Sequence, residues 1–272
     1  MGSYNLINLL NNNLMYTENI EKMSGHWLLA KIGKKVLRPG GLALTKKMLS
    51  MLDITSADDM VEFAPGLGFT AHMTLEKKPG SYIGIDAEQS AVEYLNREFG
   101  GISAQFKLGN AAESSLPEQS ASKVYGEAML SMHADHRKAE IIQEAYRILK
   151  PKGYYAIHEL ALRPENLDSN VKLHIQKELA LAIKVNARPL TVSEWTALLE
   201  KEGFKVLKVE TAPMHLLEPQ RIIDDEGVSG AIKIAKNILL NPSIRKRVLK
   251  MKKIFKKHEQ NMCAVVIIAT KE

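Results

Sequence analysis

A glycine-rich loop that follows a short apolar run carries the clearest chemical pattern in this chain. The stretch "VEFAPGLGFTA" covers residues 61–71, and from Gly66 it fits the G-x-G-x-x-G/A pattern of dinucleotide-binding loops. From Glu62, the same letters fit a second pattern, E-x-A-x-G-x-G. Glycines let a backbone approach a ligand closely, and the N–H groups of a following helix attract negative charge. The loop therefore predicts a nucleotide-type cofactor.

An acidic residue lies at the sequence distance that such a cofactor requires. Asp86 ends the apolar run "SYIGID" (81–86), twenty residues after Gly66, where a carboxylate accepts hydrogen bonds from ribose hydroxyls. Open α/β sheets bind their ligands at the carboxyl ends of the strands, which is where both residues are expected. NAD and S-adenosylmethionine both contain adenosine, so this spacing suits either cofactor.

Three features favour S-adenosylmethionine. A helical segment over 24–52 precedes the loop, as a lid would, whereas a dinucleotide domain usually starts with its glycine loop. Glu62 lies four residues before Gly66, and a carboxylate attracts an ammonium or a sulfonium but not a pyrophosphate. The stretch "AYRILKPKGYYAIHEL" (145–160) predicts a helix, a tight turn and a strand, which a second mononucleotide half does not require.

Short β-rich runs alternate with helical windows along most of the chain. This alternation predicts βαβ units, and hence an α/β fold with a mostly parallel sheet covered by helices on both faces. The clearest expected helices cover 87–99, 136–150 and 191–203. The expected strands cover 59–64, 81–86, 103–109, 123–130, 153–160, 204–210 and 263–270.

The chain divides into four predicted parts: an N-terminal helical lid (1–55), a cofactor-binding core (56–210), a basic helical insertion that forms a substrate lobe (211–260) and the last strand of the core (261–272). The Asn-rich start is expected to be irregular. No signal-peptide pattern is present, and the longest apolar run is too short to cross a bilayer. The single cysteine, Cys263, excludes a disulfide framework and fits a cytoplasmic protein.

The positive charge is concentrated in one segment. The chain has a net charge of +6, but residues 231–260 hold ten Lys/Arg and one acid, so the rest of the chain is net negative. Over 241–260, Ile244, Val248, Met251 and Phe255 form an apolar stripe beside a row of lysines. Such a helix lies on an anionic membrane, contacts nucleic acid, roofs a substrate pocket or simply packs on the core.

Four motifs in order give the chain a family resemblance: "VEFAPGLG", "GIDAEQSAVEYLN", "LGNAAE" and "RILKPKG". Over about Arg38 to Glu210 it resembles class I S-adenosylmethionine-dependent methyltransferases, and within them the quinone-methyltransferase-like branch that acts on small molecules. The resemblance implies a Rossmann-like, seven-stranded, mostly parallel sheet with an antiparallel last strand, here "CAVVIIAT". It also implies S-adenosyl-L-methionine as cofactor and S-adenosyl-L-homocysteine as product.

The resemblance assigns cofactor contacts by motif position. Asp86 and Ala87 are expected at the ribose, and Gly109, Asn110 and Ala111 at the adenine, although the family usually has Asp where this chain has Asn110. The methionine and ribose are expected beside Glu62, Ala64, Gly66, Gly68 and Glu127. In "RPGG" (38–41), Gly40 and Gly41 either approach the methionine carboxylate or form a plain interhelical turn.

Candidate catalytic residues follow the fourth and fifth expected strands. Glu127 is expected to face the sulfonium, and His133 is placed like the catalytic histidine of plant-type O-methyltransferases or caps the next helix. His158 and Glu159 point to opposite faces of their strand, so at most one faces the pocket. His133 and His136 form H-x-x-H, but no metal site is expected, because no carboxylate or cysteine cluster accompanies them.

These observations predict methyl transfer to O, S, N or an activated carbon of a small, partly apolar or anionic acceptor. No nucleic-acid specificity is expected, and 241–260 is a candidate for peripheral membrane contact. One alternative is a catalytically silent S-adenosylmethionine-binding protein that docks on a membrane or nucleic acid through this helix. An NAD-dependent oxidoreductase is a third and weaker interpretation.

Overall fold

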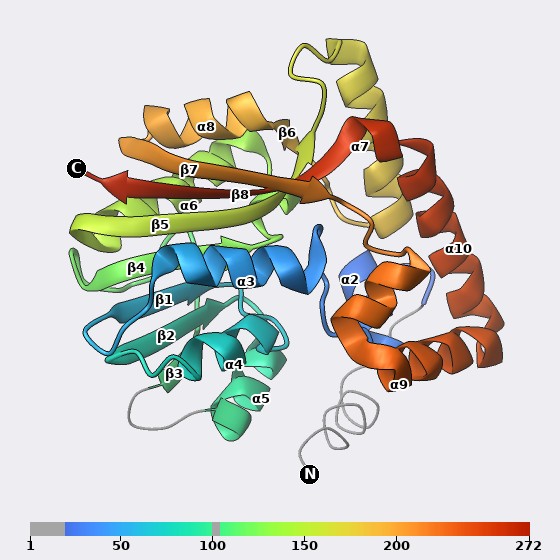
Figure 1. Ribbon diagram of the computed structural model, residues 1–272, viewed down its shortest axis with the longest axis horizontal. Helices are drawn as coiled ribbons and strands as arrows, with labels where there is room; N and C mark the ends of the chain where they lie inside the picture. The colour runs from blue at the N-terminus through green and yellow to red at the C-terminus, as the bar shows by residue number, and fades with distance from the viewer. Residues whose placement is uncertain (1–19, 100–103) are drawn as a thin grey trace.

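One mixed sheet organises the residues that the computed structural model describes, 20–99 and 104–272 (Figure 1). Its strand order is β3-β2-β1-β4-β5-β8-β7, and the two-residue strand β6 pairs with β5. The strands are β1 (Asp59–Phe63), β2 (Ser81–Asp86), β3 (Ala104–Leu108), β4 (Ala121–Glu127), β5 (Leu149–Leu162), β6 (Leu190–Thr191), β7 (Phe204–Pro213) and β8 (Met262–Lys271).

The sheet confirms the predicted fold class. Strands β1 to β6 pair in parallel with one another, and β8 runs antiparallel to both β5 and β7. The strand order reverses between β1 and β4, because the chain first builds the β1-β2-β3 side and then crosses over. At such a reversal, the connections leave in opposite directions and a crevice opens at the carboxyl ends of the strands.

Helices cover both faces of the sheet. On one face lie α6 (Asp135–Ile148) and α8 (Val192–Lys201), and on the other lie α3 (Gly41–Leu52), α4 (Phe69–Leu75) and α5 (Gln89–Phe99). Trp195 of α8 is fully buried, and its indole N–H donates to the Leu160 carbonyl at 3.2 Å. α8 therefore packs on the sheet through its tryptophan.

Four helices form a third layer beyond the carboxyl ends of the parallel strands (Figure 1): α2 (Gly25–Lys31), α7 (Ser169–Ile183), α9 (Pro219–Leu240) and α10 (Pro242–Lys257). Their buried apolar side chains make a separate cluster. The predicted substrate lobe contains α9 and α10, and the predicted lid contains α2. However, α7 packs with them although it falls within the predicted core range. The proposed division into parts remains a prediction.

Two short 3-10 helices, η2 (Leu130–Met132) and η3 (Glu259–Asn261), complete the described elements. Within the described ranges, no helix is long and apolar enough to cross a membrane. The predicted irregular start lies almost wholly outside the described residues.

Candidate active site

A cavity of about 570 Å³ opens at the crevice between β1 and β4. Its roof comes from the N-terminal region, where His26 and Trp27 of α2 and the following Leu37 and Arg38 line it. The structure brings most of the predicted site residues to this cavity: Glu62, Ala64, Gly66, Asp86, Ala87, Gly109, Asn110, Ala111, Glu127 and His133. Motifs that are up to 71 positions apart in the chain therefore meet in one place.

Hydrogen bonds from the backbone fix Asp86 beside the glycine loop. The Gly66 N–H donates to Asp86 Oδ2 at 2.9 Å, and the Glu88 N–H donates to Oδ1 at 3.0 Å. The Gly109 N–H donates to the Asp86 carbonyl at 2.9 Å, so the third motif is attached to the second. The carboxylate is thus oriented by two N–H groups while its residue still lines the cavity.

The two glycines of the loop have different surroundings. Gly66 has a φ of +56°, and the nearest atom to an added Cβ there is 3.9 Å away. Gly68 has a φ of +73° and precedes α4, and an added Cβ would lie 2.4 Å from Leu95 and 2.8 Å from Phe99. Gly66 therefore leaves space at the cavity wall, whereas Gly68 lets α4 pack closely against α5.

Glu62 is buried at the cavity wall and is bonded to two tyrosines. The Tyr125 hydroxyl donates to Glu62 Oε2 at 2.5 Å, and the Tyr82 hydroxyl donates to the same oxygen. Burial raises the pKa of Glu62 to about 7, despite these two hydrogen bonds. Near neutral pH this carboxyl is therefore poised between its neutral and charged forms.

Glu127 sits in a network of charged and hydroxyl groups. Its Oε1 accepts from the Thr45 hydroxyl at 2.6 Å, and Oε2 accepts from the Thr70 hydroxyl and lies 3.3 Å from Arg38 Nε. Burial raises its pKa, but Arg38 and the hydrogen bond from His158 more than offset this and hold the pKa at about 2. Glu127 is therefore ionised at every physiological pH and does not suit the role of a general base.

His158 is fully buried, and both its ring nitrogens face acceptors. Nδ1 lies 2.6 Å from Glu127 Oε1, and Nε2 lies 2.7 Å from the Pro39 carbonyl. Both ring nitrogens are therefore engaged, one with a carboxylate and one with a backbone carbonyl. His158 does not line the cavity. It instead anchors the loop before α3 to the strand ends.

Glu159, the next residue, points to the opposite face, as predicted. Its carboxylate accepts from the N–H groups of Met129, Leu130 and Ser131 and from the Ser131 hydroxyl, which fixes η2 beside the cavity. Neither His158 nor Glu159 lines the cavity.

His133 is the predicted catalytic residue whose ring remains available. It lines the cavity, and no side chain in the described part of the chain hydrogen-bonds to its ring. Burial lowers its pKa, as do the charges of Arg137 and Lys138, so the ring is neutral near pH 7. The alternative that His133 caps the next helix is wrong, because the N-cap of α6 is Ala134 and makes no side-chain cap bond.

The predicted contact of Gly40 and Gly41 with a cofactor carboxylate needs correction. These glycines do not line the cavity, and their N–H groups donate to the carbonyls of Met214 and Arg38 at 3.2 and 3.3 Å. Arg38 of the same loop lines the cavity instead, and its Nη2 is buried with no hydrogen-bond partner among the described residues. Sequence reasoning concentrated on the glycines and missed the arginine before them, although both stand in "RPGG".

A second cluster of possible ligands lies away from the cavity. The side chains of His174, Glu178 and His258 have ligand atoms within 4.8 Å of one another. The Lys257 ammonium, however, lies 2.8 and 2.7 Å from the two Glu178 oxygens. The cluster is therefore an ion-pair network that ties α7 to the end of α10.

Comparisons with known proteins agree with this geometry. The profile of the "Methyltransferase domain" family matches residues 60–153, which hold the glycine loop, Asp86 and Glu127. An uncharacterized protein from Haemophilus influenzae is 30% identical over 91% of this chain and 98% of its own length. The phosphoethanolamine N-methyltransferase of Plasmodium falciparum is 27% identical over 64% of this chain and 63% of its own. The chain belongs to the class I S-adenosylmethionine-dependent methyltransferases.

The solved structure of the cyclopropane synthase MmaA2 from Mycobacterium tuberculosis shares the fold of this methyltransferase. It aligns with a TM-score of 0.70 over 95% of this chain and 100% of that chain, at 12% sequence identity. The finer resemblance to the quinone-methyltransferase-like branch remains a prediction.

S-adenosylmethionine is the cofactor of this family, and the residues of the cavity fit it. Ribose hydroxyls need a hydrogen-bond acceptor, and the Asp86 carboxylate belongs to a residue that lines the cavity. A methionine carboxylate needs a cation, and Nη2 of Arg38, which also lines the cavity, has no hydrogen-bond partner among the described residues. The open space at Gly66 and a cavity of about 570 Å³ leave room for a ligand of this size.

Proposed function

We propose that this protein transfers the methyl group of S-adenosylmethionine to O, S, N or an activated carbon of a small, apolar acceptor. The observation that carries the proposal is a second cavity, of about 70 Å³, next to the cofactor cavity. The two cavities share five lining residues: His26, Leu37, Ala128, Met132 and Val185. An acceptor in the second cavity thus lies next to the cofactor.

The second cavity is apolar almost throughout. Its walls come from α2, α7, α10 and the segment before α9, with side chains such as Leu29, Leu179, Met214, Met251 and Phe255. The polar side chains among its described lining residues are His26 and Ser131, and the Ser131 hydroxyl already donates to Glu159 at 2.7 Å. Methionines adapt their shape to a ligand, so the cavity accommodates groups larger than its present volume.

We assign a cofactor role to each side chain by its place in the cavity. Asp86 is assigned to the ribose hydroxyls and Arg38 to the methionine carboxylate, because they offer an oriented acceptor and a free donor. Glu62 in its ionised form attracts the cofactor's positive groups. The adenine is assigned to the segment 109–111, and Ala64 and Gly66 form the backbone floor.

The bound cofactor supplies an electrophilic methyl group, and the protein supplies alignment. Holding two reactants in line contributes roughly 7–11 kcal/mol to lowering a barrier. An acceptor that carries a proton also needs a base, and His133 suits that role because its neutral ring faces the cavity. Glu127 and His158 act as positioning residues, since both are fully engaged with each other and with the lid loop.

His26 marks the junction of the two cavities. Its Nδ1 is buried without a hydrogen-bond partner among the described residues, and burial lowers its pKa to about 4. The other ring nitrogen, Nε2, lies 3.4 Å from Ser24 Oγ. A neutral imidazole with one unpartnered nitrogen in an apolar wall favours a hydrogen bond to a single polar group of the acceptor. We therefore assign His26 to orienting the acceptor.

The test begins with calorimetric titration of the purified protein with S-adenosylmethionine, S-adenosylhomocysteine and NAD. Release of S-adenosylhomocysteine is then measured with apolar phenols, thiols and amines, and with phosphoethanolamine as a charged comparison. The proposal expects binding of both adenosyl-sulfur compounds and turnover of apolar acceptors only. Binding of NAD alone, or a preference for phosphoethanolamine, would overturn it.

A matched pair of truncations locates the acceptor. Leu179 of α7 lines the second cavity, whereas Leu199 of α8 is equally buried and lies outside both cavities. Both Leu→Ala changes remove the same side-chain atoms from a core. We expect the KM for the acceptor to change in Leu179→Ala and to stay near the wild-type value in Leu199→Ala.

A further inference from the structure

The helices α9 and α10 leave several large aliphatic side chains in solvent. Val228, Ile232, Leu239 and Leu240 of α9 and Leu249 of α10 are between 59% and 71% exposed. Val228, Ile232 and Leu239 are spaced four and seven residues apart, so they lie on one side of α9. Leu239 and Leu240 stand immediately before the junction with α10 at Asn241. This pair of helices forms an outer edge of the molecule (Figure 1).

Positive side chains surround the exposed leucine of α10. On the helix surface, Leu249 has as neighbours Arg245, Lys246 and Lys253, which lie three or four residues away. Lys250 follows Leu249 directly, and all four cations are exposed. None of these four forms an ion pair with an acidic side chain in the described ranges, whereas the other lysines of α10 pair with Glu218, Glu259 or Glu178. The face thus combines unpaired cations with exposed aliphatic groups.

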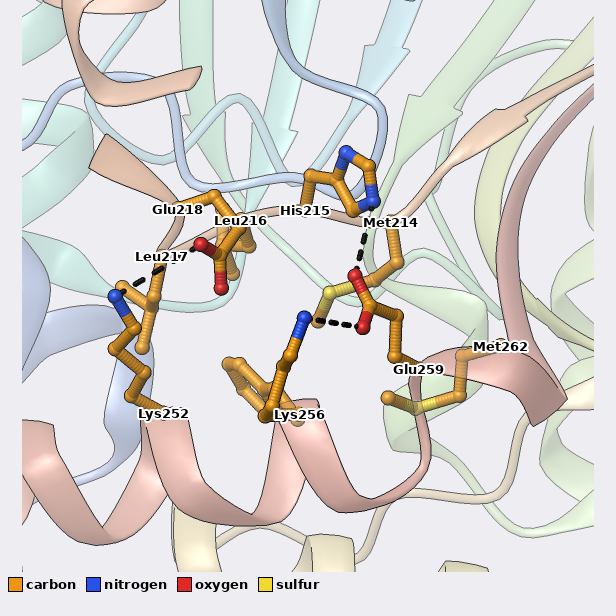
Figure 2. Close-up of a pocket in the computed structure, with 10 residues that line it drawn as sticks. Met214, His215, Leu216, Leu217, Glu218, Lys252, Lys256, Glu259 and Met262 are labelled. Carbon is orange, nitrogen blue, oxygen red and sulfur yellow. Dashed lines mark ion pairs between the residues drawn. The ribbon is translucent and has the colours of Figure 1, made fainter. Parts of the chain in front are cut away.

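The opposite side of α10 reaches the active site. Met251 and Phe255 line the apolar acceptor cavity. Outside that cavity lies a small surface pocket of about 20 Å³, which shares Met214, Leu216 and Phe255 with it. Figure 2 shows the rim of this pocket, where Lys252 pairs with Glu218 at 3.8 Å and Lys256 pairs with Glu259 at 2.7 Å.

The rim and the basic face lie next to each other on α10. Arg245, Leu249, Lys252 and Lys256 are spaced four, three and four residues apart and form one stripe along the helix. A surface held against Leu249 therefore also lies beside the pocket in Figure 2. Met214, Leu216 and Phe255 line both the pocket and the acceptor cavity and therefore lie between them.

We propose that the α9–α10 face docks on an anionic lipid surface. We define this docking face as Leu239, Leu240, Leu249, Lys246, Lys250 and Lys253. Helices that lie in a membrane interface bury aliphatic side chains between the headgroups, while their Lys and Arg side chains attract anionic lipids. Nucleic acid uses the cations through its phosphates but gives exposed leucines no apolar partner. The combination therefore favours lipid, and an apolar acceptor dissolved in that lipid lies close to its cavity.

Two triple variants separate the two halves of the docking face. The leucine variant removes exposed aliphatic groups through Leu239→Gln, Leu240→Gln and Leu249→Gln. The lysine variant removes three cations through Lys246→Gln, Lys250→Gln and Lys253→Gln. All six positions are exposed, so the variants are expected to fold. The control for the leucine variant combines Leu108→Gln and Leu207→Gln, at two exposed positions of the sheet. The control for the lysine variant combines Lys77→Gln, Lys201→Gln and Lys208→Gln, at three exposed positions outside α9 and α10.

Binding is measured by co-sedimentation with vesicles of phosphatidylcholine mixed with phosphatidylglycerol, and with vesicles of phosphatidylcholine alone. The full chain is expected to bind the anionic vesicles only. The lysine variant is expected to bind about 100-fold more weakly, because each cation near an anionic surface contributes to binding. The affinity of the leucine variant for the anionic vesicles is expected to fall at least about tenfold. The control variants are expected to bind as the wild type does.

Failure of the wild type to bind anionic vesicles, or unchanged binding by the leucine variant, overturns the proposal. Binding of a DNA duplex that survives in the leucine variant and is lost in the lysine variant also overturns it, in favour of nucleic acid. Calorimetry with S-adenosylhomocysteine is performed on the same preparations. Intact S-adenosylhomocysteine binding without vesicle binding rejects the docking face and leaves the proposed methyltransferase function standing.

Discussion

Glu127, the last residue of β4, is the register partner of His158 within β5, and Glu127 Oε1 lies 2.6 Å from His158 Nδ1. His158 Nε2 continues the connection to the Pro39 carbonyl at 2.7 Å, and Arg38 and Thr45 reach Glu127 from the same lid segment. One carboxylate thus connects two strands of the core to the loop that roofs the cofactor cavity. An ion pair and hydrogen bonds therefore attach the lid loop to the core at this point.

Removal of this carboxylate is expected to destabilise the fold strongly. Glu127→Ala leaves the Arg38 guanidinium and the His158 ring buried without their partner, and breaking a buried ion pair in this way costs about 3–5 kcal/mol. The measurement is urea unfolding at pH 7. As a control, Glu140→Ala breaks only the exposed pair with Arg137 on α6, and is expected to change stability by less than about 1 kcal/mol. Equal losses in the two variants would show that Glu127 has no special structural role.

Glu62 is expected to make stability depend on pH in the opposite direction to an ordinary acid. Its pKa in the folded protein is about 7 instead of 4.5, so the folded state binds the extra proton more tightly than the unfolded state does. The resulting stabilisation is fully present below pH 4.5 and is lost as pH rises to about 7, by roughly 3 kcal/mol. Glu62→Gln removes this titration and keeps an oxygen that accepts from Tyr82 and Tyr125.

The experiment compares urea unfolding of wild type and Glu62→Gln at pH 4.5 and pH 7.5. The stability of the variant relative to the wild type is expected to increase across this window, because only the wild type loses stability through Glu62. A constant difference between the two proteins would mean that the Glu62 carboxyl titrates in its usual range.

The sequence predicted the strands and the cofactor motifs well because both depend on local patterns. The strand "SYIGID" is β2 without a shift at either end, and Gly66 and Asp86 lie at the same cavity, as their motif positions predict. Such patterns arise where an apolar run must be buried and a tight turn needs glycine.

The sequence did not predict the contacts between distant segments. Arg38, Glu127 and His158 meet only because β4 lies beside β5 and the lid loop crosses their ends. No spacing in the chain encodes that meeting, and a lone arginine or histidine is ambiguous without it. The same reason explains why α7 was assigned to the core range, since its amphipathic pattern does not indicate which layer it covers.

The two glycines of the loop are expected to respond differently to the same substitution. Gly68→Ala places a Cβ 2.4 Å from Leu95, so it is expected to destabilise the fold by about 1–3 kcal/mol. The Cβ that Gly66→Ala adds meets no close atom, so the stability cost is only that of a positive φ, about 1 kcal/mol. This Cβ nevertheless takes up space at the cavity wall. We expect Gly66→Ala to reduce the free energy of S-adenosylhomocysteine binding by more than it reduces the free energy of unfolding. Thermal unfolding and calorimetry distinguish the two, and a reversed order would contradict this assignment.

Arg38 is expected to recognise the amino-acid end of the cofactor. Its buried Nη2 has no partner in the described part of the chain, and a charged hydrogen bond contributes about 1.5–3 kcal/mol. Arg38→Gln is therefore expected to weaken S-adenosylhomocysteine binding about 10- to 100-fold. Methylthioadenosine keeps the adenosine and the sulfur but has no carboxylate, so its affinity is expected to change by less than about twofold.

Comparing the two ligands separates recognition from a general loss of structure. A misfolded Arg38→Gln variant would lose both ligands together, whereas loss of a carboxylate contact affects only S-adenosylhomocysteine. Asp86→Asn is the matched control. Both ligands contain the ribose, so a weaker contact with its hydroxyls is expected to lower the affinity for both to a similar extent. Equal weakening of both ligands in Arg38→Gln would assign the methionine carboxylate to another group and leave Arg38 as a partner of Glu127 alone.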